Sequence, residues 1–83
     1  MSYIKADGFD AAIIGIHIES ERVIYSKDRM INILMDDDME YEDAVEFLAY
    51  NVWGAYVGEN TPMYIDEMNH QEFQEYINYE NTI

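Results

Sequence analysis

The apolar residues of segment 11–19 follow a period of two. Every even position of this segment is apolar: Ala12, Ile14, Ile16 and Ile18. Because successive side chains of a β-strand point to opposite faces, the pattern predicts a strand with one fully apolar face. Ser20 and Glu21 then form a tight connection to a second β-branched segment, residues 22–25. The two segments are therefore predicted to form a hairpin.

The spacing of apolar residues changes to three and four after Ser26, which predicts two consecutive helices. Ser26 is a typical N-cap for the first helix, over residues 27–37. Its apolar stripe is Met30, Ile31, Leu34 and Met35. The second helix is predicted over residues 40–53 and ends at Gly54. Its apolar face is Tyr41, Ala44, Val45, Leu48, Ala49 and Val52. Three aspartates, residues 36–38, form the predicted junction between the two helices.

A proline-led segment over residues 62–66 predicts a third strand, and Asn69 followed by Glu72 is typical of a capping box that opens a last helix. The apolar side of that helix is Phe73, Tyr76 and Ile77. The predicted order is therefore β-β-α-α-β-α. It indicates a single compact α+β domain over residues 1–83, with a small three-stranded antiparallel sheet packed with two to three helices. The pattern does not determine the strand order.

Composition narrows the class of protein. The 83 residues are 49% hydrophobic, which argues against disorder. The chain contains no cysteine, which excludes a disulfide scaffold, a zinc–thiolate site and a cysteine nucleophile. No apolar run approaches the length of about 18 residues that a membrane span needs, so no membrane span is expected.

Charge is distributed unevenly along the chain. Four Lys or Arg and 18 Asp or Glu give a net charge of -14, and residues 30–83 contain acids but no Lys or Arg. Binding to phosphates needs clustered cations, so direct binding to nucleic acid is excluded as the main activity, and an anionic membrane is an unfavourable partner. The charge favours a basic partner approached by electrostatic steering. The alternative is that the charge serves only solubility.

The sequence offers little for catalysis or metal binding. His17 and His70 are the only side chains with an ordinary pKa near neutrality, and nothing in the sequence places them near each other or near a nucleophile. An EF-hand loop starting at Asp36 needs Gly at its sixth position and Glu at its twelfth, where the chain has Tyr41 and Phe47. We therefore expect no enzyme activity, catalytic residue, cofactor or metal site.

Acidic and aromatic residues instead favour a binding surface. Eight Tyr, three Phe and one Trp are more than a domain of this size buries, although Phe47 and Trp53 are expected in the core. Exposed Tyr beside carboxylates suits a cationic partner. Acids three or four residues apart on a helix have Cβ atoms about 5–6 Å apart, which is similar to the phosphate spacing of one DNA strand. The predicted partner-binding residues are Asp36, Asp37, Asp38, Glu40, Glu42, Asp43, Glu46, Glu72 and Glu75, with Tyr50 and Tyr79 as aromatic contacts.

Three segments carry a resemblance to a known family: DGFDAAIIG over residues 7–15, MEYEDAVEF over residues 39–47 and GAYVGENTP over residues 54–62. In these segments the chain resembles a family of small, acidic, uncharacterised proteins encoded by tailed bacteriophages. The resemblance implies a phage origin and action in the cytoplasm of a bacterial host, and it supplies no catalytic residue. In charge and size alone, such proteins are also similar to anti-restriction and anti-CRISPR inhibitors that mimic DNA.

The leading hypothesis is a non-enzymatic phage protein that binds and inhibits a basic, nucleic-acid-handling host protein such as a defence nuclease, as a DNA mimic. The alternative hypothesis is a small phage accessory or assembly module, with a homodimer as one form, that acts through an apolar-aromatic surface. In both, the partner is a protein, with no direct contact to nucleic acid or membrane.

Overall fold

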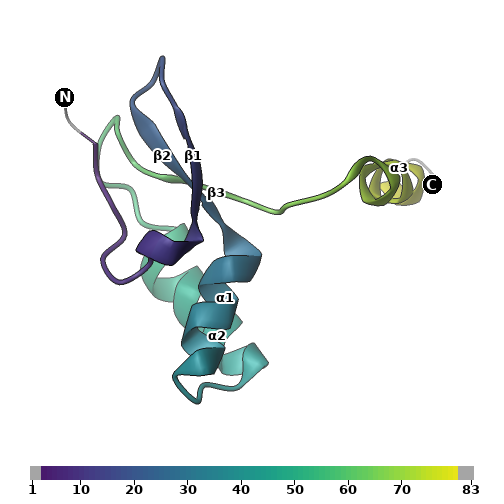
Figure 1. Ribbon diagram of the computed structural model, residues 1–83, viewed down its shortest axis with the longest axis horizontal. Helices are drawn as coiled ribbons and strands as arrows, with labels where there is room; N and C mark the ends of the chain where they lie inside the picture. The colour runs from purple at the N-terminus through teal and green to yellow at the C-terminus, as the bar shows by residue number, and fades with distance from the viewer. Residues whose placement is uncertain (1–2, 81–83) are drawn as a thin grey trace.

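The computed structural model describes residues 3–80 and has the predicted β-β-α-α-β-α order (Figure 1). A 3-10 turn, η1 (Asp10–Ala12), precedes the strands β1 (Ile13–His17) and β2 (Arg22–Ser26). The helices α1 (Lys27–Asp36) and α2 (Tyr41–Leu48) follow, and α2 continues into a π-helical turn, η2 (Ala49–Trp53). The strand β3 (Met63–Ile65) and the helix α3 (His70–Glu80) complete the described chain. The prediction of an α+β fold is confirmed.

The sheet is mixed, in the order β1-β2-β3. β1 and β2 form the predicted antiparallel hairpin, with Ile16 opposite Val23. The prediction of a fully antiparallel sheet is wrong, because β3 pairs with β2 in parallel, with Ile24 opposite Met63. A parallel neighbour requires a crossover connection. Here α1, α2, η2 and the loop over residues 54–62 form that crossover and return the chain to the start of β2.

The core lies where β2, η1, α1 and α2 meet. Its buried apolar side chains are Phe9, Ala12, Val23, Tyr25, Met30, Ile31, Ala44 and Leu48. Tyr25 is fully buried, and its ring stacks on the ring of Tyr64 with centroids 5.6 Å apart. The Ala6 amide donates a hydrogen bond of 2.7 Å to the Tyr25 hydroxyl, which ties the N-terminal segment to β2.

Only part of the apolar face predicted for the first strand contacts the core. Ile18 is 69% exposed, and Ile16 is also exposed, while Ala12 and Ile13 contact the core. Two features explain the difference. The pairing register with β2 shifts between Ile13 and Gly15, and such an irregularity interrupts the alternation of faces. Ile18 also lies in the hairpin turn, where its carbonyl accepts a hydrogen bond from the Glu21 amide.

The first two helices begin where the sequence predicts. The Ser26 hydroxyl accepts a hydrogen bond from the Arg29 amide at 3.3 Å, which is the expected N-cap of α1. Trp53 packs against the core as expected. The expected burial of Phe47 is wrong, because this side chain is 42% exposed. Leu48, the next residue along α2, is the one that points into the core.

The last helix stands apart from the rest of the molecule. Figure 1 shows α3 at the end of an extended tether, residues 66–69, clear of the sheet and of the α1–α2 pair. The Cα radius of gyration is 14.3 Å, compared with about 12 Å for a compact chain of this length. Of the two to three helices predicted to pack with the sheet, α1 contacts β2, and α2 packs on α1 and adds Ala44 and Leu48 to the same core. Within residues 3–80, no helix combines the length and apolarity needed to cross a membrane.

Candidate protein-binding surface

All eleven predicted partner-binding residues are exposed, but the structure divides them into two groups. The first group surrounds the connection between α1 and α2 and the exposed side of α2. We call it the acidic corner, and it consists of Asp36, Asp37, Asp38, Glu40, Glu42, Asp43, Glu46 and Tyr50. The second group, Glu72, Glu75 and Tyr79, lies on α3, away from the corner (Figure 1). The two acidic helices therefore do not form one continuous track.

Backbone hydrogen bonds fix the aspartates of the acidic corner. The Asp37 amide donates to the Leu34 carbonyl at 3.1 Å, and the Asp38 amide donates to the Met35 carbonyl at 3.0 Å. Asp38 has a φ of 70°, a left-handed conformation that Asp tolerates better than most residues. This sharp reversal ends α1 and places three consecutive exposed carboxylates at the junction, as the sequence predicts.

The start of α2 concentrates further negative charge. Glu40 is the N-cap residue, and Glu42 and Asp43 occupy the first turn. Carboxylates at this end of a helix are favoured by the helix dipole. The local fold therefore tolerates a charge density that would be unfavourable at the other end of α2.

One exposed side of α2 and η2 combines acids with aromatic rings. Asp43, Glu46 and Tyr50 line an open hollow of about 440 Å³. The other lining residues are Met39, Phe47 and Asn51. Tyr50 is 83% exposed, and the Asn51 side chain donates a hydrogen bond of 2.9 Å to the Phe47 carbonyl. Carboxylates beside exposed rings match the chemistry of an Arg or Lys side chain, through ion pairing and cation–π contact.

Sequence reasoning missed Met39, Phe47 and Asn51 as part of this hollow. Their spacing carries the signal, because Asp43, Phe47 and Asn51 are four residues apart and share one side of a helix. Phe47 was instead expected in the core on the ground that it is large and apolar. Burial of Leu48 leaves Phe47, one helical step away, at the surface.

The basic residues lie elsewhere and are already engaged. Lys5 pairs with Asp10 at 3.1 Å, and Arg29 pairs with Glu67 at 3.0 Å. Arg22 donates a hydrogen bond to the Thr61 carbonyl at 2.6 Å. Lys27 lies 3.8 Å from Asp66 and 4.9 Å from the centroid of the Trp53 ring. In the part of the chain that the structure describes, no ion pair involves an acid of the acidic corner.

The hairpin turn brings together a Ser, a His and a Glu that sequence reasoning did not connect. His17 Nδ1 lies 2.8 Å from Ser20 Oγ, and His17 Nε2 lies 3.6 Å from the Glu19 carboxylate. The Ser20 amide also donates to Nδ1 at 3.3 Å, so that nitrogen acts as an acceptor. His17 is the last residue of β1, Glu19 and Ser20 lie in the turn that follows, and none of the three lines the hollow on α2. The arrangement closes the turn, whereas acyl transfer also needs a substrate cavity with oxyanion donors.

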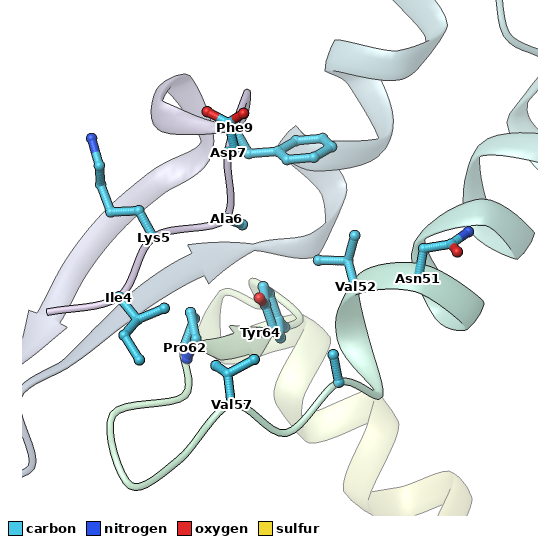
Figure 2. A pocket seen from close by; sticks show the side chains of 11 residues that line it. Ile4, Lys5, Ala6, Asp7, Phe9, Asn51, Val52, Val57, Pro62 and Tyr64 are labelled. Carbon is cyan, nitrogen blue, oxygen red and sulfur yellow. The ribbon is translucent and has the colours of Figure 1, made fainter.

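A small apolar groove lies between the N-terminal segment and the loop over residues 54–62. Its volume is about 210 Å³, below the roughly 300 Å³ at which sites for small molecules begin. Figure 2 shows Ile4, Val52 and Tyr64 among the residues around it. Burial raises the pKa of the Tyr64 hydroxyl above its ordinary value of 10.0. The groove fits a single side chain better than a free ligand.

Neither a metal-binding cluster nor a known relative points to a different functional site. Among residues 3–80, no group of three or more His, Asp or Glu is arranged to hold a metal ion. Comparison with protein-family models, with curated proteins and with solved structures gives no match. The acidic corner, with its hollow on α2, is therefore the candidate site.

Proposed function

We propose that the protein is a non-enzymatic binding protein whose acidic corner occupies the cationic, nucleic-acid-binding surface of another protein and thereby inhibits it. The observation that supports this most is the hollow on α2, where Asp43 and Glu46 lie beside Phe47 and Tyr50 with no base to neutralise them. A cationic cleft that binds DNA presents Arg and Lys in the positions such a surface can engage.

The resemblance to small acidic phage proteins gives this proposal a setting. A phage protein acting in the cytoplasm of a bacterial host would meet defence nucleases, which hold clefts rich in cations. Inhibition of an anti-restriction or anti-CRISPR type, by mimicry of DNA, is the specific form we favour.

A second candidate is an accessory or assembly module that acts through apolar and aromatic residues. It is favoured by the exposed aromatic side chains on α3, Phe73, Tyr76 and Tyr79. In this case the acidic charge would serve solubility, and a homodimer is one form that the module could take. Sedimentation of the protein alone reports on that form.

The test compares the protein with a variant that lacks three charges of the acidic corner. The substitutions Glu42→Gln, Asp43→Asn and Glu46→Gln keep side-chain size and leave the buried Ala44 and Leu48 untouched. The probe is a panel of purified bacterial nucleases with cationic DNA clefts. We expect inhibition and a salt-sensitive association that the triple substitution slows, because complementary charge acts mainly on the association rate.

A matched control removes three charges elsewhere. Asp7→Asn, Glu19→Gln and Glu59→Gln lie in loops outside the acidic corner. This control variant should associate with the nuclease at close to the wild-type rate. DNA should compete with the wild type and with the control variant for the nuclease. Equal association rates for the two triple variants, or binding that DNA and salt leave unchanged, would contradict DNA mimicry and favour the accessory module.

A further inference from the structure

The helix α3 carries an apolar face and stands apart from the sheet and from α1 and α2 (Figure 1). Phe73, Tyr76 and Ile77 are three and four residues apart and therefore share one side of the helix. We call these three residues the α3 stripe. Phe73 is 47% exposed and Tyr76 is 50% exposed, and Figure 1 shows the helix clear of the core. Apolar residues at this spacing are the usual mark of a helix that packs against a partner.

The helix α3 is stabilised by local hydrogen bonds rather than by tertiary packing. The Asn69 amide donates to the Glu72 carboxylate at 3.0 Å, and the Glu72 amide donates to the Asn69 side chain at 2.8 Å. This is the predicted capping box. Helices of fewer than about 12–15 residues are nonetheless marginal in water when they have no tertiary contacts. α3, with 11 residues, would therefore be stabilised by contact with another surface.

The tether is fixed at its first two residues. Asp66 pairs with Lys27, and Glu67 pairs with Arg29 and accepts a hydrogen bond from the Ser26 hydroxyl. These contacts attach the start of the tether to the start of α1. The direction in which the chain leaves the body is thereby set, and it leads α3 away from the core (Figure 1).

Charge decides what kind of surface can cover the stripe. Glu72 lies beside the stripe, Glu75 lies one turn further on toward the opposite side of the helix, and the chain has no Lys or Arg after Arg29. A second copy of this chain is a poor occupant, because its four Lys and Arg are engaged as described above and it adds a further charge of -14. A groove lined by apolar residues and edged by Lys or Arg matches both the stripe and the uncompensated negative charge of α3.

We propose that α3 is a docking helix that inserts the α3 stripe into an apolar groove, edged by Lys or Arg, on a different protein. This inference goes beyond the acidic corner and does not require that the partner handle nucleic acid. It names a second contact surface, on a separate element, with its own recognition chemistry.

The test uses the full chain and a designed helical hairpin as the probe. The hairpin presents a groove of Leu between two helices, with Lys along both edges, and a matched hairpin carries Glu at the same edges. NMR spectra of the isotope-labelled protein should show shifts concentrated in residues 70–80 when the Lys-edged hairpin is added. Binding to the Glu-edged hairpin should be at least tenfold weaker.

Substitutions separate the stripe from the helix itself. Phe73→Ala, Tyr76→Ala and Ile77→Ala together remove the stripe while favouring helix formation, so a loss of binding cannot come from loss of the helix. We expect affinity for the Lys-edged hairpin to fall at least tenfold. The control, Gln71→Ala with Gln74→Ala, should change affinity less than twofold, because these residues lie outside the stripe.

Three outcomes would overturn the proposal. One is that the stripe variant binds the Lys-edged hairpin as tightly as the wild type does, or that the wild type binds the two hairpins equally. Another is a set of shifts centred on α2 instead of α3. The third is a dimer of the wild-type protein in sedimentation that the stripe variant loses, which would make a second copy the occupant. None of these outcomes depends on competition by DNA, so the acidic-corner proposal stands or falls separately.

Discussion

The buried Ser26 hydroxyl donates a hydrogen bond to the Glu67 carboxylate, although the two residues lie 41 positions apart in the sequence. The same hydroxyl accepts from the Arg29 amide and caps α1. One side chain therefore both starts a helix and holds the tether of α3. This bond is the main reason that the pKa of Glu67 is lowered, and Arg29 contributes in the same direction.

Replacement of Ser26 by Ala should affect both roles. We expect a loss of about 1 kcal/mol in the free energy of unfolding, the usual cost of an N-cap, and a rise in the pKa of Glu67. The pKa of Glu67 is lower in the folded protein than in the unfolded chain. Glu67 therefore contributes to stability above the ordinary Glu pKa of about 4.3, and this contribution is lost as the pH falls through the pKa of the folded protein. Urea unfolding and carboxyl carbon NMR measure the two effects.

Arg29→Gln is the control for this substitution. This substitution removes the ion pair with Glu67. It keeps the backbone amide of residue 29, which donates to the Ser26 hydroxyl, and therefore keeps the N-cap of α1. It should also raise the pKa of Glu67, because Arg29 lowers this pKa both through its charge and through its hydrogen bond. An unchanged pKa in Ser26→Ala would contradict the assignment of the hydroxyl as the main cause.

Tyr25 predicts how the fold responds to alkaline pH. Burial raises its pKa above the ordinary value of 10.0. Because the pKa of Tyr25 is higher in the folded protein than in the unfolded chain, its contribution to the free energy of unfolding is complete below about pH 10. This contribution declines as the pH rises toward the pKa of Tyr25 in the folded protein. Tyr25→Phe should reduce this decline, which thermal melts at pH 8 to about 11 can follow.

The same substitution also tests the hydrogen bond to Ala6. Without the hydroxyl, the partly buried Ala6 amide loses its acceptor, and we expect a loss of about 1–3 kcal/mol in stability near neutral pH. Tyr64→Phe keeps that hydrogen bond and should cost less. Equal costs for the two substitutions would show that the Ala6 contact contributes nothing measurable.

Phe47 and Leu48 are neighbours in α2 with opposite expected roles. Leu48→Ala should cost about 2–5 kcal/mol in stability, because it opens a cavity in the core. Phe47→Ala should cost clearly less and should instead weaken binding at the hollow on α2. Urea unfolding together with nuclease binding checks both. A greater loss of stability from Phe47→Ala would place Phe47 in the core after all.

Added salt should raise the melting temperature. Repulsion among the acids penalises the compact state, and residues 30–83 hold no base to offset it. An increase in sodium chloride from 0.01 M to 0.1 M shortens the screening length from about 30 Å to about 10 Å. Thermal melts at these two concentrations test the effect. A lower or unchanged melting temperature in the higher salt would contradict the argument from repulsion.

Local signals in the sequence were sufficient to place the elements. The Ser26 cap, the Asn69–Glu72 capping box and the helical spacing around Ala44 and Leu48 act within a few residues, so each can be read without knowledge of the fold. The same holds for the aspartate junction of residues 36–38, which depends on a turn of the backbone and on exposure of three carboxylates.

Features that depend on distant contacts could not be read in the same way. The parallel pairing of β3 depends on where the crossover returns the chain, and the register shift between Ile13 and Gly15 depends on pairing with β2. The alternation around Ile16 and Ile18 therefore predicted an apolar face, which the hairpin leaves exposed at these two residues. The hollow on α2 was missed for a related reason, since size alone assigned Phe47 to the core.

The short tether has a consequence for the kinetics of binding. Asp66 and Glu67 are held by the body, and the two tether residues that follow span at most about 7 Å, so once the acidic corner has engaged a partner, α3 can search only the nearby surface. For linkers this short, the effective concentration of the second contact is on the order of millimolar. A partner that engages both surfaces would be released only when both separate at the same time. Residence time would then report on the length and attachment of residues 66–69 as much as on the residues in contact.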